Sequence, residues 1–470
     1  MSFFSKLNDA IRANDSLLCV GLDPQEDMLP LDGSIEDRLF DWGQAVIGQT
    51  SDLVCCYKPN FAFYEQFGLD GLRALQRTIK AIPETIPVLL DVKRGDIGST
   101  ASALSLAAYN QWGVDAVTLS PYFGEDSIKP FLEPEGKAVF ILCFTSNPSA
   151  GKIQQHGLPP LFEQIARYSR NWGSTEQIGL VVGATQPDAL SIVRENCPQT
   201  WILAPGVGAQ GGDLEEILQI GLRTDGSGMI IPVSRGILTV ADPRKAAIEL
   251  RDSIRLVQVK VKSQAKVVLS KKSDLVVAVF TTGCIKFGSF TLASGQQSPI
   301  YIDLRRIISF PGLFRKVAQA YAEIVQGLNF DHIASVPYAA LPAGSVVAWE
   351  LGVSMIYPRK EVKQHGTGQA IEGSFEAGQS AVLIEDVITT GGSIISAAEI
   401  LRNAGLLLKD VVVLVDREQG GVEAMNNIGL SLYSVLKISE IVLILKDSGM
   451  IDADNFKSLN QYIDASNPGR

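Results

Sequence analysis

Short apolar runs alternate with helical patterns through the first half of the chain. Each run ends in a polar or glycine-containing turn, and apolar residues recur at helical spacing between the runs. This alternation is typical of parallel strands joined by helices. Eight runs fit it, at 16–23, 53–60, 87–94, 116–121, 138–146, 178–185, 201–208 and 228–237. Eight such units in roughly 250 residues predict an α/β fold, an N-terminal (β/α)8 TIM barrel.

The pattern changes near residue 260. An amphipathic helix at 243–257 would close the barrel, and the lysine-rich stretch 260–272 then lacks a clear core pattern, which predicts a linker or a helical extension. Strand-like runs return at 332–337, 353–357, 381–384 and 410–415, and they predict an open α/β sheet with a mainly parallel core. We therefore expect a barrel domain at 1–259, a linker at 260–273 and a second domain at 274–470.

Composition narrows the class of protein. The 470 residues are 46% hydrophobic and carry a formal net charge of −10, which argues against a general nucleic-acid binder. The six cysteines form no CxxC pair, so buried, reduced thiols are expected. The N-terminus lacks the apolar core of a signal peptide, and no run approaches the length of a membrane span. We expect a cytoplasmic protein that binds neither nucleic acid nor membrane.

An unusual group of charges lies at the end of the third run, in Asp91-Val92-Lys93-Arg94-Gly95-Asp96. Lys58 ends the second run, and neighbouring barrel strands bring their ends within reach of one another. Lys58, Asp91, Lys93 and Asp96 could therefore form an alternating chain of charges. A structural ion network and a reaction centre are both open, and the place at the carboxyl end of a barrel strand favours the reaction centre.

A phosphate-binding pattern follows the last two strands of the barrel. The segment 206–212 is rich in glycine, and Arg235 ends the eighth run. Loops after these strands form the usual phosphate site of such barrels. Gly206, Gly208 and Gly211 also spell the dinucleotide fingerprint GxGxxG, but a true fingerprint lies in an early βαβ unit and has an acidic residue after the next strand. A phosphate site is therefore favoured over a dinucleotide site.

These segments together resemble the orotidine 5′-monophosphate (OMP) decarboxylases, specifically the bacterial branch with an arginine after the catalytic lysine. The resemblance covers nearly all of the first domain and includes Thr145-Ser146-Asn147, which alone could be an ordinary turn. It implies that Lys93 stabilises and protonates the carbanion at C6 and that Asp91 faces the substrate carboxylate, with no metal or cofactor. The other implied roles are Lys58, Asp96 and Asp23 at the ribose, Ser146 at the pyrimidine, Pro205, Gln210 and Arg235 around the nucleotide and its phosphate, and Asp96, Ile97 and Thr100 entering from a partner subunit.

The second domain contains a strand followed by two acids and a hydroxyl- and glycine-rich turn, at 382–393. Such a turn at a helix N-terminus can bind a phosphate, and adjacent carboxylates can hold ribose hydroxyls directly or through Mg²⁺. This resembles the phosphoribosyl-pyrophosphate (PRPP) site of type I phosphoribosyltransferases. The resemblance implies that Glu385 and Asp386 hold the ribose and that Thr389, Thr390, Gly391 and Gly392 hold the 5′-phosphate.

Two further segments resemble orotate phosphoribosyltransferase. The basic stretch 359–366 could be a solvated surface loop, but beside a pyrophosphate site it would be a lid. The stretch 286–295 offers an aromatic surface and a lysine. The resemblance implies pyrophosphate contacts from Lys286, Arg359, Lys360, Lys363 and His365, with Lys363 and His365 in catalysis, and orotate contacts from Arg417 and Phe287, with Arg305 a weaker candidate.

The combination resembles the bifunctional UMP synthases, with the order of the domains inverted relative to animals and plants. The expected partners are orotate, PRPP, OMP and UMP, with Mg²⁺ near Glu385 and Asp386 and a homodimer or larger homo-oligomer that shares active sites. Two alternatives are weaker. A sugar-phosphate lyase or epimerase would lack Arg94 and the fused transferase, and a PRPP-binding regulator of purine genes should carry a basic DNA-binding module.

Overall fold

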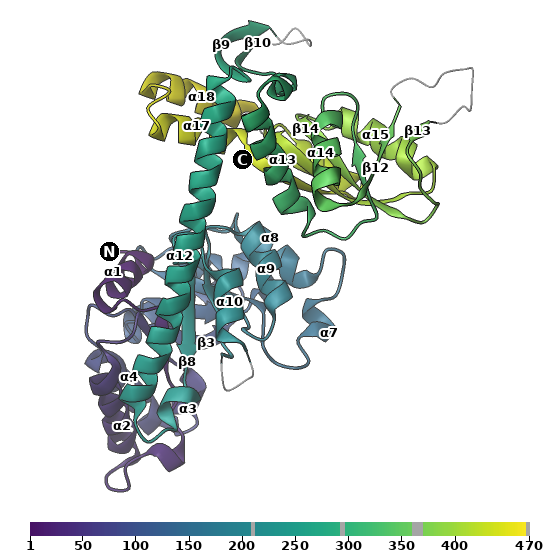
Figure 1. Ribbon diagram of the computed structural model, residues 1–470. Helices are drawn as coiled ribbons and strands as arrows, with labels where there is room; N and C mark the ends of the chain where they lie inside the picture. Colours follow the sequence, from purple (N-terminus) through teal and green to yellow (C-terminus); the bar gives the residue numbers. More distant parts are fainter. Residues whose placement is uncertain (208–211, 292–296, 360–369, 467–470) are drawn as a thin grey trace. The chain divides into compact units, whose positions relative to one another are not determined.

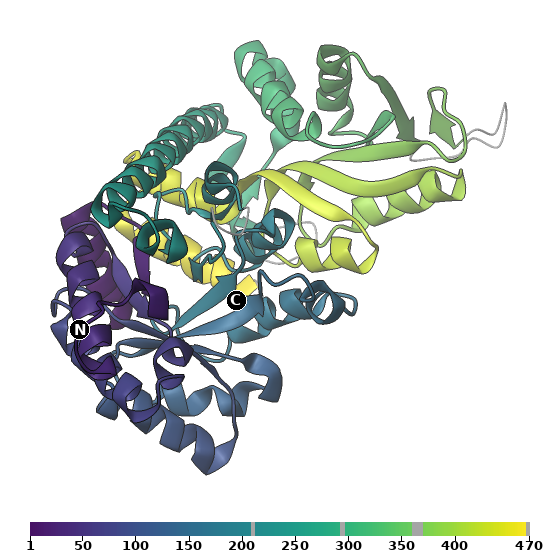
Figure 2. The ribbon, with the colours of Figure 1, turned by 90° about the horizontal axis from the view of Figure 1, so that it is seen from below.

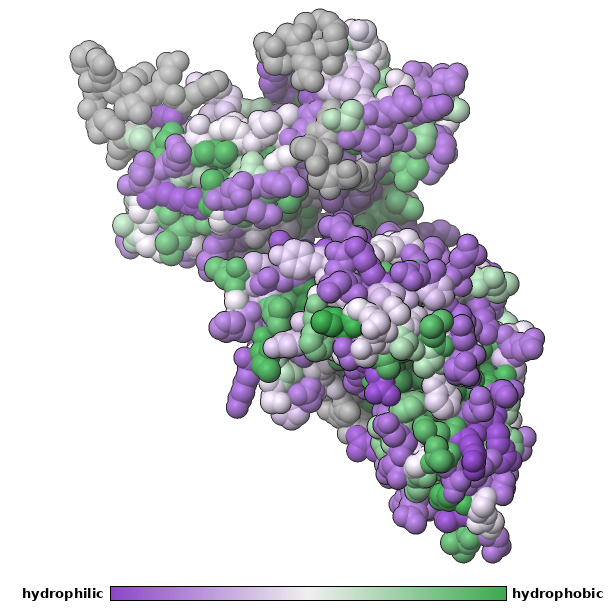
Figure 3. Space-filling model, turned by 180° about the vertical axis from the view of Figure 1, so that it is seen from behind, coloured by the Kyte–Doolittle hydropathy of each residue, from purple (hydrophilic) through white to green (hydrophobic). Residues whose placement is uncertain are grey.

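The computed structural model describes residues 1–207, 212–291, 297–359 and 370–466. The chain divides into two compact units, Met1–Lys266 and Val267–Arg470, shown from two directions in Figures 1 and 2. The face in Figure 3 is largely polar, with apolar side chains scattered over it in small groups. In the described part of the chain, no helix combines the length and apolar character that a membrane crossing needs.

The first unit is a closed barrel of parallel strands, as predicted. The strand order is β2-β1-β8-β7-β6-β5-β4-β3, and parallel bridges from Tyr57 to Val88 and from Asn60 to Asp91 close the ring between β2 and β3. All eight predicted runs form strands. They are β1 (Leu18–Leu22), β2 (Cys56–Pro59), β3 (Leu89–Arg94), β4 (Ala116–Leu119), β5 (Ala138–Phe144), β6 (Ile178–Val182), β7 (Trp201–Leu203) and β8 (Met229–Val233).

Helices surround the barrel, and most of them bury apolar side chains against it. In α2, Ser34 caps the helix by accepting a hydrogen bond from the backbone N–H of Asp37, and Leu39, Trp42 and Val46 face the core. The helices are α1 (Phe3–Asn14), α2 (Ile35–Thr50), α3 (Phe61–Glu65), α4 (Gly68–Ala81), α5 (Gly98–Leu106), α6 (Lys129–Leu132), α7 (Gly151–Gln154), α8 (Leu161–Ser169), α9 (Pro187–Asn196), α10 (Leu214–Gly221), α11 (Arg235–Leu238) and α12 (Pro243–Thr281).

Helix α1 packs on the amino-terminal ends of β5 and β7. The ring of Phe4 stacks on Trp201 at a centroid distance of 5.9 Å and meets Phe140 edge to face. We expect Phe4→Ala to destabilise the barrel by about 3–5 kcal/mol, since it leaves a cavity in a packed core. Urea unfolding followed by loss of decarboxylase activity measures this. The exposed Leu69 of α4 provides the control, and a Phe4→Ala midpoint equal to that of Leu69→Ala would contradict the prediction.

The second unit is an open α/β sheet with helices on both faces. The strand order is β13-β12-β11-β14-β15-β16, and only β13 is antiparallel to its neighbour. Val382 and Ile384 of β14 face one apolar core, and Leu383 faces the other. The strands are β11 (His332–Ser335), β12 (Ser354–Pro358), β13 (Ile371–Glu372), β14 (Ser380–Ile388), β15 (Leu407–Asp416) and β16 (Ser431–Lys437), and the helices are α13 (Pro311–Val325), α14 (Leu341–Leu351), α15 (Gly392–Asn403), α16 (Gly421–Asn427), α17 (Ile438–Asp447) and α18 (Ala453–Ser466).

The sequence pattern predicted four strands of this sheet, β11, β12, β14 and β15, but not β13, β16 or a separate hairpin. The hairpin pairs β9 (Ile285–Thr291) with β10 (Gln297–Ile302) in antiparallel fashion. Strand β13 has only two residues. The two serines of β16, of which Ser431 is exposed, interrupt its apolar pattern, because an edge strand has no need of continuous apolar residues.

The predicted linker is helical. Helix α12 continues unbroken from Pro243 to Thr281. The predicted segment 260–273 is therefore a helical extension and not a flexible linker. The stretch from 244 to 281 contains neither glycine nor proline, and the helix ends before Gly283, whose φ is +70°. The division after Lys266 lies inside the predicted linker 260–273.

Candidate active sites

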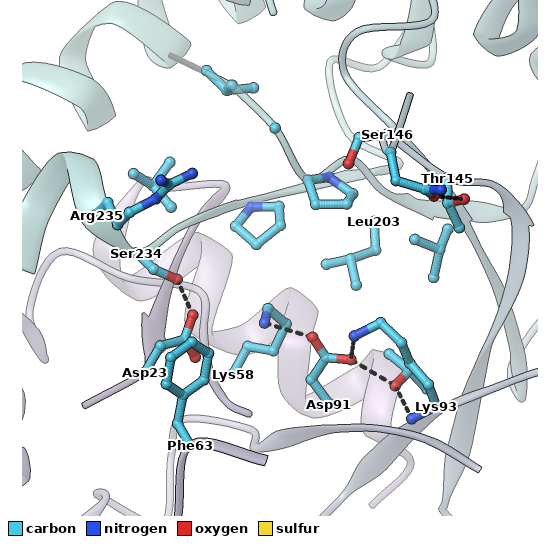
Figure 4. A pocket seen from close by; sticks show the side chains of 18 of the residues that line it. Asp23, Lys58, Phe63, Asp91, Lys93, Thr145, Ser146, Leu203, Ser234 and Arg235 are labelled. Atoms are coloured by element: carbon cyan, nitrogen blue, oxygen red, sulfur yellow. Dashed lines mark hydrogen bonds and ion pairs between the residues drawn. The ribbon is translucent and has the colours of Figure 1, made fainter. Parts of the chain in front are cut away.

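A cavity of about 710 Å³ opens at the carboxyl ends of the barrel strands. Figure 4 shows the polar side chains of several strand ends pointing into it. All of the predicted decarboxylase residues at the ends of β1, β2, β5, β7 and β8 in the described part of the chain line this cavity, together with two from β3. They are Asp23, Lys58, Asp91, Lys93, Ser146, Pro205 and Arg235.

Asp91 lies between two lysines at the base of the cavity. The Lys58 ammonium is 2.9 Å from Asp91 Oδ2, and the Lys93 ammonium is 2.6 Å from Oδ1. The side chains of Lys58 and Asp91 are 8% and 10% exposed, whereas that of Lys93 is 50% exposed. The buried pair of Lys58 and Asp91 therefore holds the Lys93 ammonium at the open side of the site.

Mutual pairing keeps these groups charged. Burial raises the pKa of Asp91, but the charges of Lys58 and Lys93 outweigh it and hold this pKa well below the ordinary value. Burial lowers the pKa of Lys58, and the charges of Asp91 and Asp23 more than restore it, so that it lies above the ordinary value. Carboxylate and ammonium thus coexist in the cavity at neutral pH.

Two polar residues of the site were missed from the sequence. Thr118 on β4 donates a hydrogen bond of 2.9 Å from its hydroxyl to Asp91 Oδ1. Ser234 donates one of 2.6 Å to Asp23 Oδ2, while Asp23 Oδ1 is buried and has no partner among the described residues. An unpaired buried acceptor that faces a cavity is suited to a ligand hydroxyl. Thr118 is the one polar residue of the run 116–119, which is the signal that could have drawn attention to it.

The segment Thr145-Ser146-Asn147 after β5 forms a local turn and also contributes a side chain to the cavity. Thr145 donates a hydrogen bond of 2.6 Å to Asn147 Oδ1, which is a local turn contact. Ser146 lines the cavity. A Cβ on Gly183 would lie 2.9 Å from the Ser146 backbone, so a glycine is needed there for β6 to approach this turn closely. The turn thus positions Ser146.

Three of the four charged residues predicted to form a network, Lys58, Asp91 and Lys93, do so within one subunit, and the fourth, Asp96, does not. Strand β3 ends at Arg94 and α5 begins at Gly98, so Asp96 lies on the connection that leaves the cavity. Among the described residues, neither lysine pairs with Asp96, whose Oδ1 accepts a hydrogen bond from the backbone N–H of Ile97. Ile97 and Thr100 are exposed and do not line the cavity. Gln210 lies outside the described residues.

In the second unit, two acids and a turn meet at the carboxyl end of β14. Glu385 and Asp386 lie within the strand rather than after it, because β14 extends to Ile388. The residues Thr389, Thr390 and Gly391 then turn into α15, which begins at Gly392, and Gly391 has a φ of +82°. The helix N-terminus therefore faces the same end of the sheet as the acids, as the predicted phosphate site requires.

Glu385 is held in place by its neighbours. Its Oε1 accepts the backbone N–H of Asp386 at 3.0 Å, and its Oε2 accepts the Ser393 hydroxyl at 2.9 Å. Burial and then the adjacent Asp386 carboxylate raise the pKa of Glu385 well above the ordinary value. Two crowded carboxylates are stabilised by a cation, and Mg²⁺ commonly binds one or two carboxylates plus substrate oxygens. No cluster of three or more acidic, histidine or cysteine ligands occurs among the described residues, so any metal here would take its remaining ligands from substrate and water.

The predicted base-binding residues lie on neighbouring elements. Arg417 follows β15, and its guanidinium lies 3.5 Å from the Ser298 hydroxyl on β10. Ser298 is two residues from Ile300, which pairs with Phe287 on β9. The Phe287 ring is half-buried and packs against Phe280 at 5.5 Å. The hairpin thus brings Phe287 to the side of the sheet where Arg417 lies.

The predicted pyrophosphate contacts are only partly described. Lys286 is exposed on β9, and Arg359 at the end of β12 pairs with Glu372. The weaker candidate Arg305 pairs with Asp303 at 2.8 Å. Lys360, Lys363 and His365 lie outside the described residues.

Two family models match the chain, one within each compact unit. Residues 16–250 match the orotidine 5′-phosphate decarboxylase / HUMPS family, and residues 305–428 match the phosphoribosyl transferase domain. An orotidine 5′-phosphate decarboxylase of Herpetosiphon aurantiacus is 49% identical over 244 residues, which cover 50% of this chain and 89% of that protein.

Two relatives match the chain from end to end. The bifunctional enzyme PyrF/PyrE of a Nostoc species is 43% identical over 475 residues, covering 98% of this chain and 99% of the relative. The solved structure of a Leishmania donovani UMP synthase is 40% identical, covers 99% of this chain and 100% of its own, and has a TM-score of 0.52. Both halves and their order are therefore shared, and the chain belongs to the family of bifunctional enzymes in which an orotidine 5′-phosphate decarboxylase precedes an orotate phosphoribosyltransferase.

Proposed function

We propose that the two domains catalyse consecutive reactions that end in UMP. The second domain joins orotate to PRPP and releases pyrophosphate, which gives OMP, and the first domain converts OMP to UMP and CO2. The observation that supports this most strongly is the Lys58–Asp91–Lys93 cluster at the base of a nucleotide-sized cavity. The six cysteines are buried and free, which suits a reducing cytoplasm.

Lys93 is the residue that acts at the reacting carbon. When the bond between C6 and the carboxylate breaks, its electron pair stays on C6, and no π system can delocalise it. A fixed ammonium stabilises that charge and then donates a proton to it. Asp91 faces the substrate carboxylate, so that their repulsion disappears as CO2 leaves.

Groups far from C6 hold the nucleotide. Arg235, and Gln210 by resemblance, bind the 5′-phosphate, and the unpaired Asp23 Oδ1 accepts a ribose hydroxyl. Ser146 contacts the pyrimidine, and Pro205 lines the same cavity. Binding energy from the phosphate and ribose offsets the cost of bringing the substrate carboxylate beside Asp91.

A second subunit completes this site in our proposal. Asp96, Ile97 and Thr100 lie outside their own cavity, and Ile97 is 53% exposed, so these residues are free to enter the cavity of a partner. The protein is then a homodimer or a larger homo-oligomer with shared sites.

The transferase site acts on the ribosyl carbon of PRPP. Glu385 and Asp386 hold the ribose hydroxyls, Thr389 to Gly392 hold the 5′-phosphate, and Arg417 with Phe287 holds orotate. Lys286, Arg359, Lys360, Lys363 and His365 neutralise the departing pyrophosphate. Glu385 and Asp386 would hold Mg²⁺, which would supply further positive charge to that leaving group.

The full chain supplied with orotate, PRPP and Mg²⁺ should form UMP, CO2 and pyrophosphate. Lys363→Ala should leave orotate unconsumed, with transfer slowed about 100-fold or more by the loss of a cation at the leaving group, yet it should decarboxylate added OMP normally. Chromatographic separation of orotate, OMP and UMP measures both steps. Failure of the unmodified chain to form UMP would refute the proposed function, and normal transfer by Lys363→Ala would refute the role of that lysine.

A further inference from the structure

The β3–β4 pairing is interrupted at the reactive residues. Leu90 pairs with Val117 and Arg94 pairs with Leu119, so that Asp91, Val92 and Lys93 together lie opposite the single residue Thr118. Lys93 has a φ of +45°, in the left-handed region that residues with a side chain rarely occupy. The two surplus residues bulge out of the sheet and carry Lys93 with them.

A bulge removes backbone N–H groups from the ladder of hydrogen bonds, and they need another acceptor. The Thr118 hydroxyl oxygen accepts the N–H of Val92 at 3.0 Å and that of Lys93 at 2.9 Å. The same hydroxyl donates its proton to Asp91 Oδ1 at 2.9 Å. A hydroxyl has one proton and two lone pairs, so these three bonds use its whole capacity.

Thr118 therefore fixes both ends of the Lys93 side chain. It holds the strained backbone from which the side chain starts, and it orients the carboxylate oxygen to which the ammonium is bound at 2.6 Å. Thr118 is 1% exposed and lies on β4, which pairs with β3 on one side and β5 on the other, so it is itself rigidly placed. Residues other than glycine rarely keep a positive φ without such support from their surroundings.

We propose that Thr118 is a positioning residue of the decarboxylase, which sets the place of the Lys93 ammonium relative to C6. The inference rests on the proposed role of Lys93 in the first domain. A displacement of about 1 Å at a reacting group can lower a rate about 100-fold. The loss should lie in kcat, because the phosphate and ribose contacts that fix the nucleotide are made by other strands.

Thr118→Val removes the hydroxyl and keeps the shape, and Thr118→Ser restores the hydroxyl. Thr50→Val is the matched control, because Thr50 is a buried threonine on α2 whose hydroxyl bonds to the Val46 carbonyl and the Tyr57 hydroxyl, away from the cavity. The full chain carries its own reference as well, since transfer from PRPP to orotate by the second domain should be unchanged in every variant.

We expect Thr118→Val to lower kcat for OMP about 10- to 100-fold while KM and the dissociation constant of UMP change less than about threefold. Thr118→Ser and Thr50→Val should stay within about threefold of the unmodified chain. If the valine variant does not bind UMP, Thr118→Cys replaces it, because a thiol is a weak donor and acceptor, and the same loss relative to serine is expected. The inference would be overturned if the variant that binds UMP, Thr118→Val or its replacement Thr118→Cys, kept a kcat within threefold of the unmodified chain. A loss confined to KM would overturn it as well. No decarboxylation by the unmodified chain would instead refute the proposed function.

Discussion

Lys93→Ala should turn the chain into an enzyme that stops at OMP. Supplied with orotate, PRPP and Mg²⁺, this variant should accumulate OMP and release almost no CO2. In the proposed function the group lost is both the cation beside C6 and the proton donor. Each of these effects alone contributes about 100-fold or more, so a loss of about 10⁴-fold or greater in kcat is expected. Release of labelled CO2 from carboxyl-labelled OMP measures it directly.

This experiment also decides between an ion network and a reaction centre. The Lys93 side chain is half-exposed, so its ion pair with Asp91 should add at most about 1 kcal/mol to stability. A purely structural role therefore predicts a small loss of stability and normal turnover, whereas a reaction centre predicts nearly normal stability and no turnover. Lys80→Ala, on the exposed face of α4, is the control for surface charge. Normal CO2 release by Lys93→Ala would contradict the assignment.

The barrel could be predicted because its strands are buried on both faces. Cys19 and Val20 of β1 are both buried, as are Leu180 and Val181 of β6, so each strand forms an uninterrupted apolar run. The polar end of such a run then marks the cavity, which is how Asp23, Lys58 and Lys93 were found. Strand β16 was not predicted, because it lies at the edge of the sheet, where residues such as Ser431 are exposed and burial no longer imposes an apolar pattern.

Tertiary geometry decided the features that the sequence did not reveal. The structure brings Asp91 and Lys93 together through a bulge and a left-handed residue, not through the regular alternation of a strand. The same bulge redirects the chain, which explains why Asp96 does not join the cluster in its own cavity. Thr118 reads as one polar residue in an apolar strand, and only the pairing of β3 with β4 reveals its three hydrogen bonds.

Neutralising the two acids of β14 should have the largest effect on the other half of the reaction. We expect Glu385→Gln combined with Asp386→Asn to lower kcat/KM for PRPP by about 100- to 1,000-fold. In the proposed function the two carboxylates bind ribose hydroxyls and attract Mg²⁺, whereas an amide carries no charge for the cation. A titration of transferase rate against Mg²⁺ should show a raised requirement for the metal. Decarboxylation of added OMP should be unchanged, because it involves the other unit.

Glu399→Gln on the exposed side of α15 is the control, since it removes one negative charge from the helix that follows the phosphate turn without touching the strand. A chelator adds a second, independent contrast in the unmodified chain. It should stop formation of OMP from orotate and leave decarboxylation of OMP running, because the cluster around Lys93 provides its own fixed cations. If the double variant used PRPP and Mg²⁺ like the Glu399→Gln control, the acids of β14 would be structural, and the ribose and metal would have to be held elsewhere in the transferase.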